Sequence, residues 1–458
     1  MSRSRSDDTV VVGHDDYALE RVPADARYPW WSIAIQRFGQ LSALAQFLLG
    51  ATLGFGMPFW NAILAITVGS VLLEIVTVFV GIAGMREGLS TSVLARWTGF
   101  GTKGSALVGL LIGVSLIGWF GVQNAVFGTG LHSVLGAMPV WVWSLLGGVA
   151  VTAVVVYGFG GMTWTAYVTV PAFLVLAIWA VARELSRHPI ADLLASAPAG
   201  PRLSLAAGAT LVAGGFIVGA VMTPDMTRYN RSVADVVKQT VIGVTLGEYV
   251  VGVIGVLLAH AARTSDVVMM ITTTSGLIGT VVLVASILKI NDWNLYSSSL
   301  GLVNVLHVLL GRKVNRAVVT IVVGVLGAAL SALGILAYFT DFLSFVGILM
   351  PPVAGICIAE YFIVKTWRPV LEASRGRGEL PATAPGWVPA GLVAWLTGGL
   401  VGYFVDIGIP AINSLAVATV AYIVLGKLGL IARRGATASQ SESVSATSTA
   451  IAHNTDQG

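Results

Sequence analysis

Two groups of polar and aromatic residues interrupt otherwise apolar stretches of this chain, and both could bind a flat ring. In the first group, Trp119 and Gln123 are four residues apart and therefore lie on one face of a helix. An indole face can stack on a ring while an amide one turn away hydrogen-bonds the ring's edge. Taken alone, Trp119 is more often a packing residue, so the pair needs support from a second group.

That second group is the polar run from Ser286 to Ser297, which contains Lys289, Asn291 and Asn294. So much polarity inside an otherwise apolar helix is costly and indicates a functional cause. For Lys289 the alternative is that its charged end reaches a membrane interface. Its position in the middle of the segment favours a buried role.

Two carboxyl groups, those of Glu74 and Glu248, also lie inside apolar segments. Each is a candidate partner of Lys289 or a candidate proton carrier, and for each a structural ion pair is an equally good interpretation. The histidines and the other acidic residues are scattered, and none has the spacing of a metal site. We therefore expect neither a metal nor a cofactor.

Two apolar segments are rich in residues that loosen helices. The first contains three glycines between Gly50 and Gly56, and the sixth contains Gly214-Gly215-Phe216. Interrupted helices at matching places in two halves of a chain indicate a transporter's substrate site. We expect both helices to be broken there and Gly215 to line the site. The alternative is that the glycines only allow close helix packing.

The elements that must position these residues are membrane-spanning helices. From Gly104 to Ala182 the chain has no Asp, Glu, Lys or Arg over 79 residues, and the whole chain is 56% hydrophobic and 10% charged. A soluble protein of this length could not cover its surface with so little charge. The apolar runs are continuous rather than alternating, which excludes a barrel and predicts an all-α integral membrane protein embedded in a lipid bilayer.

The apolar segments predict twelve transmembrane helices. They are expected near residues 33–55, 58–83, 106–132, 139–158, 161–182, 203–223, 237–262, 270–298, 317–337, 341–364, 386–405 and 409–431. This count places both termini on one side, which then holds 21 of the 26 basic residues. The asymmetry predicts that both termini are cytoplasmic in a cell membrane, and the net charge of +4 reports orientation rather than a nucleic-acid partner.

Several motifs resemble those of the purine/cytosine permease family of nucleobase–cation symporters, in consistent order from about residue 17 to residue 430. These motifs are Glu20-Arg-Val-Pro23, Gly84-Met-Arg-Glu-Gly88 with the residues up to Arg96, Gly118-Trp-Phe-Gly121, Asn291-Asp292 with Tyr296, and Pro351-Pro-Val-Ala-Gly355. The eighth segment is similar to the fungal-type, proton-coupled branch.

The resemblance implies two inverted five-helix repeats plus two C-terminal helices, with helices 1 and 6 broken and transport by alternating access. On this basis residues 32–431 form the transporter domain, with repeats at 32–182 and 203–364 and the extra helices at 386–431. Residues 1–31 form a cytoplasmic tail. The tail at 436–458 is rich in Ser, Thr and Ala and is predicted to be disordered.

The resemblance also implies roles for individual residues. Trp119 matches the ring-stacking aromatic residue of the third helix, and Phe216 matches a second aromatic on the sixth. Gln123 matches an amide that binds the ring's edge, and Asn291 and Asn294 match polar positions of the eighth helix.

Three positions depart from bacterial cytosine permeases, which carry Gln, Ser and Asn where this chain has Leu116, Val218 and Ser286. Each hydrogen bond lost in this way costs a cytosine-shaped ligand about 1–3 kcal/mol. A purine or another flat heterocycle therefore fits at least as well as cytosine, with Ser286 still a candidate binding residue.

The coupling ion is predicted from Lys289 and Ile290. In sodium-coupled relatives two adjacent hydroxyl residues of the eighth helix help to hold Na⁺ at these positions. An ammonium group cannot ligate a cation and would itself occupy the positive site. We expect Lys289 to replace Na⁺ and a proton to drive transport.

The chain is thus interpreted as a symporter that imports a nucleobase or related heterocycle, and not as an enzyme. An enzyme would need clustered acids or a metal site, and a channel would need a selectivity motif or charged rings. The alternatives that stay open are a transporter of amino acids or other small solutes with the same fold, and a sodium-coupled heterocycle symporter. The oligomeric state does not follow from the sequence.

Overall fold

The computed structural model describes residues 17–431, except 42–43, 266, 339–344, 406, 430 and most of 159–185. Every regular element within these residues is a helix, as the sequence predicted. The first part of the chain forms η1 (Ala24–Ala26), α1 (Trp30–Leu41), α2 (Leu44–Gly56), α3 (Phe59–Glu87), α4 (Thr91–Leu94), α5 (Gly101–Leu135), α6 (Val140–Val156) and α8 (Ile190–Ala195).

The second part continues with helices of very different lengths. It forms α9 (Leu205–Val221), α10 (Pro224–Thr227), α11 (Val233–Thr240), η2 (Val241–Thr245), η3 (Gly247–Val251), α12 (Gly252–Ala262), α13 (Val267–Leu310), α14 (Arg316–Ala332), η4 (Ile335–Tyr338), α16 (Pro351–Ile358), η5 (Ala359–Val364), α17 (Arg368–Arg375), α18 (Pro389–Phe404) and α19 (Pro410–Lys427). Three of these, η2, η3 and η5, are π-helical turns that continue neighbouring α-helices.

Most of the predicted spans coincide with helices. The spans at 58–83, 139–158 and 409–431, for example, correspond to α3, α6 and α19. The fifth predicted span, 161–182, lies largely outside the described residues, and residues 1–16 and the tail at 436–458 lie entirely outside them. Helix α13 runs for 44 residues, well beyond the predicted end at residue 298, because nothing in Ser297–Leu310 stops a helix before Gly311 with its positive φ.

The prediction that the glycines break the first helix is wrong in position. Helix α2 runs through all three glycines, and the change of direction lies before it, where α1 and α2 meet at an angle of 50°. Gly50 lies against the backbone of Gly252 on α12, where an added Cβ would come within 2.3 Å of the carbonyl oxygen. These glycines therefore serve close helix packing, which was the alternative interpretation.

The sixth helix differs from its prediction in the same way. Helix α9 is continuous from Leu205 to Val221 and includes Gly214 and Gly215. It ends at Met222, after which Pro224 begins the short helix α10. The interruption therefore lies beyond the glycine stretch, because helix-compatible glycines lower helix stability without ending the helix, whereas a proline cannot continue the backbone hydrogen bonds.

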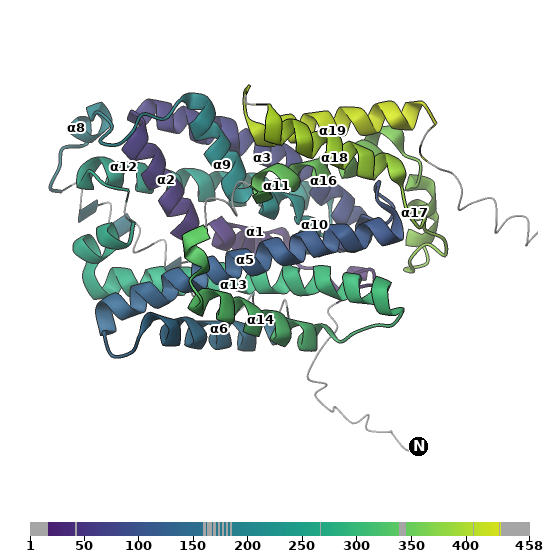
Figure 1. Cartoon of the computed structure of the whole chain (residues 1–458), viewed down its shortest axis with the longest axis horizontal. Coiled ribbons are helices and arrows are strands. Elements are labelled where there is room, and N and C mark those ends of the chain that lie inside the picture. Colours follow the sequence, from purple (N-terminus) through teal and green to yellow (C-terminus); the bar gives the residue numbers. More distant parts are fainter. Residues whose placement is uncertain are drawn as a thin grey trace, which may run out of the picture.

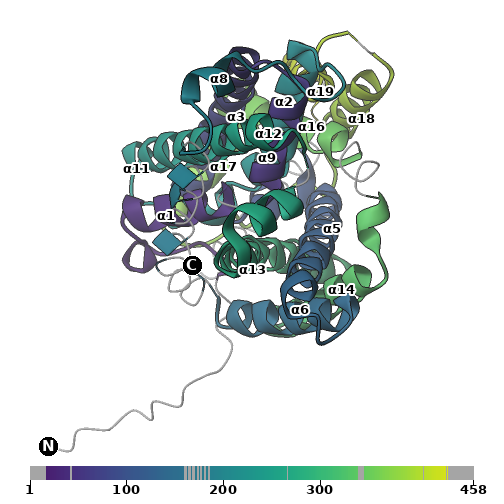
Figure 2. The ribbon, with the colours of Figure 1, turned by 90° about the vertical axis from the view of Figure 1, so that its left-hand side faces the viewer.

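The two longest helices, α5 and α13, pack along each other, with α6 and α14 beside them (Figures 1 and 2). Helix α3 packs against α9, α2 against α12, and α18 against α19. The bend between α1 and α2 lies among these groups. Helices α8 and α17 mark opposite ends of the molecule's longest axis (Figure 1).

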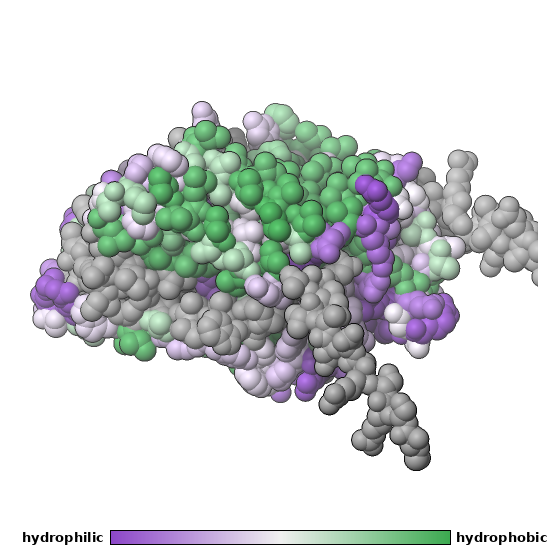
Figure 3. Space-filling view, turned by 90° about the horizontal axis from the view of Figure 1, so that it is seen from below, coloured by the Kyte–Doolittle hydropathy of each residue, from purple (hydrophilic) through white to green (hydrophobic). Residues whose placement is uncertain are grey.

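The outer surface is suited to lipid. Hydrophobic residues cover the middle of one face, and hydrophilic residues gather toward its two ends (Figure 3). Among the described residues five helices are long and apolar enough to cross a membrane, or six if α1 and α2 form one bent span. Four further apolar helices, α6, α9, α14 and α18, have 16 or 17 residues. The chain is therefore a multi-pass membrane protein.

Candidate functional site

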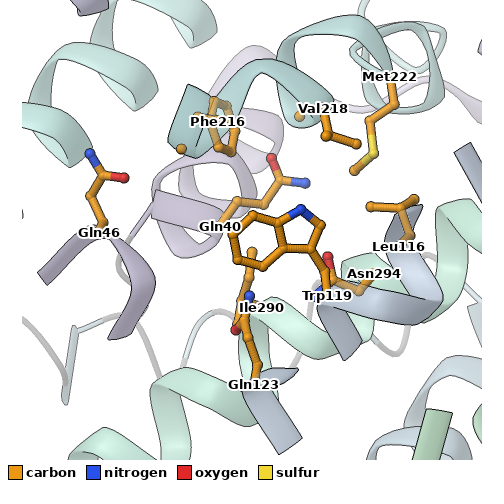
Figure 4. Close-up of a pocket in the computed structure, with 12 residues that line it drawn as sticks. Gln40, Gln46, Leu116, Trp119, Gln123, Phe216, Val218, Met222, Ile290 and Asn294 are labelled. Carbon is orange, nitrogen blue, oxygen red and sulfur yellow. The ribbon is translucent and has the colours of Figure 1, made fainter. Parts of the chain in front are cut away.

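A pocket lies where the bend of the first helix meets α5, α9 and α13 (Figure 4). The space between its lining atoms is about 480 Å³, including the part that is open to solvent. Its lining residues are Gln40, Gln46, Leu116, Trp119, Gln123, Gly215, Phe216, Val218, Gly219, Met222, Ile290 and Asn294.

Two aromatic residues predicted to stack on a ring both line this pocket. Trp119 comes from α5 and Phe216 from α9, and both side chains face the cavity in Figure 4. Each is largely buried, with exposed fractions of 7% and 9%. Gly215, the neighbour of Phe216, also lines the pocket, and no side chain there separates α9 from the cavity. The structure thus brings together residues from segments about 100 positions apart.

The amides predicted to bind the ring's edge lie differently from one another. Gln123 and Asn294 line the pocket, and the Oε1 atom of Gln123 has no hydrogen-bond partner among the described residues. Asn291 does not line the pocket. Its Nδ2 donates to the carbonyl oxygen of Phe120 at 3.3 Å, and its Oδ1 accepts from Nδ2 of Asn294 at 2.9 Å. Asn291 therefore orients Asn294 and leaves the Oδ1 of Asn294 toward the cavity.

Two further amides line the pocket that the sequence interpretation did not single out. Gln40 lies in the last turn of α1 and Gln46 in the first turn of α2, so they stand on either side of the bend. Both are buried, with exposed fractions of 3% and 4%. The sequence did contain a signal for these two residues, because Gln36, Gln40 and Gln46 are polar residues in an apolar span. The polar residues of the eighth span were singled out for the same reason.

Arg37 also belongs to the surroundings of the pocket, although the sequence interpretation gave it no role there. It is one of the 21 basic residues assigned to the side that holds the termini, and it is fully buried on α1. Its Nη1 donates to Oε1 of Gln40 at 3.2 Å, and its Nη2 donates to Oγ1 of Thr223 at 3.0 Å. Its guanidinium also lies 5.8 Å from the ring centre of Phe216. Arg37 therefore holds the back of the pocket together.

Lys289 is buried, with an exposed fraction of 2%, so it does not reach a membrane interface. Its Nζ forms an ion pair with Oδ2 of Asp292 at 2.6 Å, one turn along α13. Among the described residues it forms no salt bridge with Glu74 or Glu248. Its chain neighbour Ile290 lines the pocket, whereas Lys289 itself does not.

The two candidate carboxyls have partners of their own. Thr245 donates to Glu74, and Nε2 of Gln46 donates to Oε2 of Glu248 in a close contact. Glu248 is fully buried, and its Oε1 has no partner among the described residues. Glu248 is thus linked to the pocket through Gln46.

Of the three positions that were expected to differ from cytosine permeases, two line the pocket and the side chain of the third is not described. Leu116 and Val218, where the chain departs from bacterial cytosine permeases, both line the cavity. The side chain of Ser286 lies outside the described residues. Within the described part of the chain no group of three or more His, Cys, Asp or Glu residues is placed to hold a metal ion.

At the end of the molecule that carries α17, a different cluster of buried charges joins the N-terminal segment to the helices. The carboxylate of Glu87 pairs with Arg21 at 2.9 Å and with Arg375 at 2.5 Å, and it accepts from the hydroxyl of Tyr361 at 2.6 Å. Burial lowers the pKa of Arg21, while the hydrogen bond and charge of Glu87 act in the opposite direction. This cluster lies apart from the pocket and has no lining residue in common with it.

Known permeases match most of this chain. A family of permeases for cytosine and purines, uracil, thiamine and allantoin matches residues 27–429. The cytosine permease of Escherichia coli K12 is 30% identical over 355 residues, which cover 76% of this chain and 81% of that protein. The hydantoin permease of Microbacterium maritypicum is 23% identical over 365 residues, which cover 74% and 72%.

One similar solved structure is that of Mhp1, a nucleobase-cation-symport-1 family transporter, in a closed conformation with bromovinylhydantoin bound. It aligns with this chain with a TM-score of 0.76 at 19% identity, and the alignment covers 92% of this chain and 96% of Mhp1. A Na⁺-coupled sialic acid symporter aligns with a TM-score of 0.66 at 13% identity, covering 92% and 93%. At these identities the likeness shows a shared transporter fold.

Proposed function

Because the chain belongs to the family of permeases for cytosine and purines, uracil, thiamine and allantoin, we propose that it imports a nucleobase or related planar heterocycle by proton symport. The family consists of transporters, and this chain is not an enzyme. Two relatives of this chain are named as permeases of cytosine and of hydantoin. Both compounds are flat, neutral rings, which supports this substrate class.

The observation that carries the proposal is the composition of the pocket. Two aromatic faces, Trp119 and Phe216, stand among four amides, and none of the twelve lining residues in the described structure carries a charge. Aromatic faces stack on planar rings, and amides satisfy the donors and acceptors at ring edges. A zwitterionic amino acid would bring two charges into a pocket whose lining offers no charged side chain to pair with either of them.

The family resemblance implies ring-binding roles for several of the residues that line this pocket. We therefore assign Trp119 and Phe216 to stacking on the ring, and Gln123 and Asn294 to hydrogen bonding at its edge. Asn291 then positions Asn294, and Gly215 gives the ring room beside α9. The twelve spans, the two inverted repeats and the cytoplasmic location of both termini belong to the same proposal.

Proton coupling is supported by the surroundings of Lys289. Its ammonium is buried in an ion pair at the position where sodium-coupled relatives place hydroxyl ligands. A fixed positive charge there competes with a bound cation. We assign Lys289 the role of that fixed charge, with Na⁺ not required.

A thermal-shift panel on the purified protein tests the substrate class. Nucleobases, allantoin, hydantoins and amino acids are compared, and we expect at least one heterocycle to raise the melting temperature. Trp119→Ala should abolish this shift, whereas Trp60→Ala, at an exposed position outside the pocket, should preserve it. Stabilisation by an amino acid alone would overturn the substrate class.

Uptake into proteoliposomes in choline medium, with a proton gradient imposed, tests the coupling. We expect concentrative uptake without Na⁺. A strict requirement for Na⁺ would favour the sodium-coupled alternative.

A further inference from the structure

The two glutamines at the bend of the first helix each have one end of the amide fixed from behind. Oε1 of Gln40 accepts from Arg37, so the NH₂ group of Gln40 is left for the pocket. Nε2 of Gln46 donates to Glu248, so Oε1 of Gln46 is left for the pocket. Figure 4 shows this oxygen directed toward the other lining residues and the nitrogen directed away from them.

Glu248 is the less constrained of the two groups behind these amides. It lies on the π-helical turn η3, and such turns in a helix are frequent at functional sites. One carboxyl oxygen contacts Gln46, and the other has no hydrogen-bond partner among the described residues. A carboxyl inside a membrane span that lacks a cationic partner is a common place for a transporter to bind a proton.

We propose that Glu248 is the proton-binding site of the transport cycle and that Gln46 conveys its protonation state to the substrate pocket. This inference rests on the proposed function and names the carrier of the coupled proton. It also makes Gln46 a residue that determines which edge of the ring is bound.

The mechanism follows from which hydrogen bonds each form can make. An ionised carboxylate only accepts, so it holds the NH₂ end of Gln46 and leaves an acceptor oxygen in the pocket. A protonated carboxyl has an O–H to donate, and that proton gains an acceptor when the amide of Gln46 turns by half a rotation. The pocket then receives an NH₂ donor in place of the oxygen.

The exchange of an acceptor for a donor in the pocket determines which substrates can bind. In the protonated state Gln40 and Gln46 both present donors, which suits a heterocycle with a ring carbonyl at that edge. When Glu248 releases its proton, Gln46 turns its oxygen toward the carbonyl of the ligand. Two acceptors then face each other, and the ligand is released. Proton and oxo-heterocycle are therefore bound together and released together, as symport requires.

The other titratable groups near η3 are few. Helix α3 contributes Glu74, which accepts from Thr245, and α1 contributes Arg37. Helix α12 contributes His260, whose ring nitrogens contact the carbonyl oxygens of Leu193 and Met57. The turn η3 itself contributes Tyr249, whose hydroxyl donates to Oγ1 of Thr67, and helix α2 and the turn η2 contain no titratable residue. Glu74 is therefore the group that competes with Glu248 for the role of proton carrier.

The test measures binding of single oxo-heterocycles, namely uracil, hypoxanthine and allantoin, to the purified full-length protein at about pH 5.5 and about pH 8. We expect the dissociation constant to be roughly 10-fold lower at the acidic pH, within the usual range of coupling between two sites. Glu248→Gln carries a permanent NH₂ donor, so it should bind as tightly as the protonated wild type at both pH values. It should also exchange substrate across the membrane but fail to accumulate it.

Three further variants distinguish proton binding from the transmission of its effect to the pocket. Gln46→Leu should lose the pH dependence although Glu248 is intact, because the group that conveys the charge is gone. Glu360→Gln changes a buried glutamate on another π-helical turn, η5, and should retain the pH dependence of the wild type. Retention of the pH dependence by Glu248→Gln or by Gln46→Leu would overturn the inference, as would its loss in Glu74→Gln with retention in Glu248→Gln.

The outcomes also distinguish this inference from the proposed function. Failure of every heterocycle to bind the wild type at either pH would contradict the proposed function itself. Binding that does not depend on pH would contradict only the inference. Should Glu248→Gln fail to fold, infrared spectroscopy of the wild type gives the same decision. The band of a protonated carboxyl must then grow when a heterocycle binds near neutral pH, and its absence refutes the role of Glu248.

Discussion

Two buried glutamates occupy the second position of two π-helical turns, but their surroundings differ. Glu360 on η5 uses both carboxyl oxygens, since Oε1 accepts from the backbone nitrogen of Trp367 and Oε2 accepts from the hydroxyl of Tyr422, each at 3.0 Å. Glu248 on η3 has a partner for one oxygen only, the amide of Gln46. The same local backbone feature therefore carries a saturated carboxyl in one place and a half-satisfied carboxyl in the other.

This difference distinguishes carboxyl groups that stabilise the structure from a carboxyl group that can change its protonation state. A buried polar group whose hydrogen bonds are complete fixes its neighbours, because any rearrangement leaves a donor or acceptor without a partner. Glu87 is of the same kind as Glu360, since two arginines and a tyrosine surround its carboxylate. Glu248 adjoins the pocket and can exchange one hydrogen-bond pattern for another.

The largest expected effect comes from breaking the saturated cluster. Glu87→Ala removes the partner of Arg21 and Arg375, and we expect the free energy of unfolding to fall by about 3–5 kcal/mol, as for other broken buried ion pairs. The melting temperature measures this change. Glu372→Ala, at an exposed position that pairs with Arg368, should cost no more than about 1 kcal/mol. Weaker heterocycle binding by Glu87→Ala at unchanged melting temperature would contradict the structural role.

A somewhat smaller effect is expected at Lys289. Lys289→Met removes the ammonium that pairs with Asp292, which should lower stability by about 3 kcal/mol and abolish concentrative uptake. Lys289→Met/Asp292→Asn removes both charges and should recover most of the stability without recovering uptake. Recovery of uptake by the double variant would show that a fixed positive charge is not needed for coupling.

A smaller effect still is expected at the saturated member of the glutamate pair. Glu360→Gln keeps the shape of the side chain and one acceptor, so it should lower stability by about 1–2 kcal/mol through the hydrogen bond that it loses. Chemical denaturation or thermal melting measures this loss. Accumulation of substrate under a proton gradient should be unchanged, and a clear fall in accumulation at normal stability would remove the distinction between the two glutamates.

The parts of the fold that follow from composition were predictable from the sequence. Continuous apolar runs such as 58–83 and 139–158 define their helices, because a helix satisfies every backbone group within one apolar segment in lipid. The bend of the first helix was not predictable from its glycines. At Gly50 the backbone of α12 leaves no room for a Cβ atom, so the glycine there indicates a close approach of two helices rather than a break.

The site was predictable where a side chain's chemistry determines its environment. Trp119, Gln123 and Phe216 were expected to share a site and do line one pocket. Gln40 and Gln46 were missed because an amide in an apolar span can be satisfied by a neighbouring helix, and the sequence does not show which partner it has. The pairing of Lys289 with Asp292 depends on rotamers within α13, which spacing permits but does not determine.

The smallest effect is expected from a substitution that adds a polar group to the lining of the pocket. Val218 lines the pocket, and the family resemblance implies a serine at this position in bacterial cytosine permeases. Val218→Ser supplies a hydroxyl that can hydrogen-bond an exocyclic amino group, which is worth about 1 kcal/mol, or roughly a 5-fold gain in affinity for cytosine. Val221→Ser, on the same helix but outside the pocket lining, should cost stability without improving cytosine binding. Competition binding with cytosine measures the gain. An equal gain in both variants would mean that the hydroxyl acts through helix α9 and not through contact with the ring, so the pocket would not be the place where substrates are distinguished.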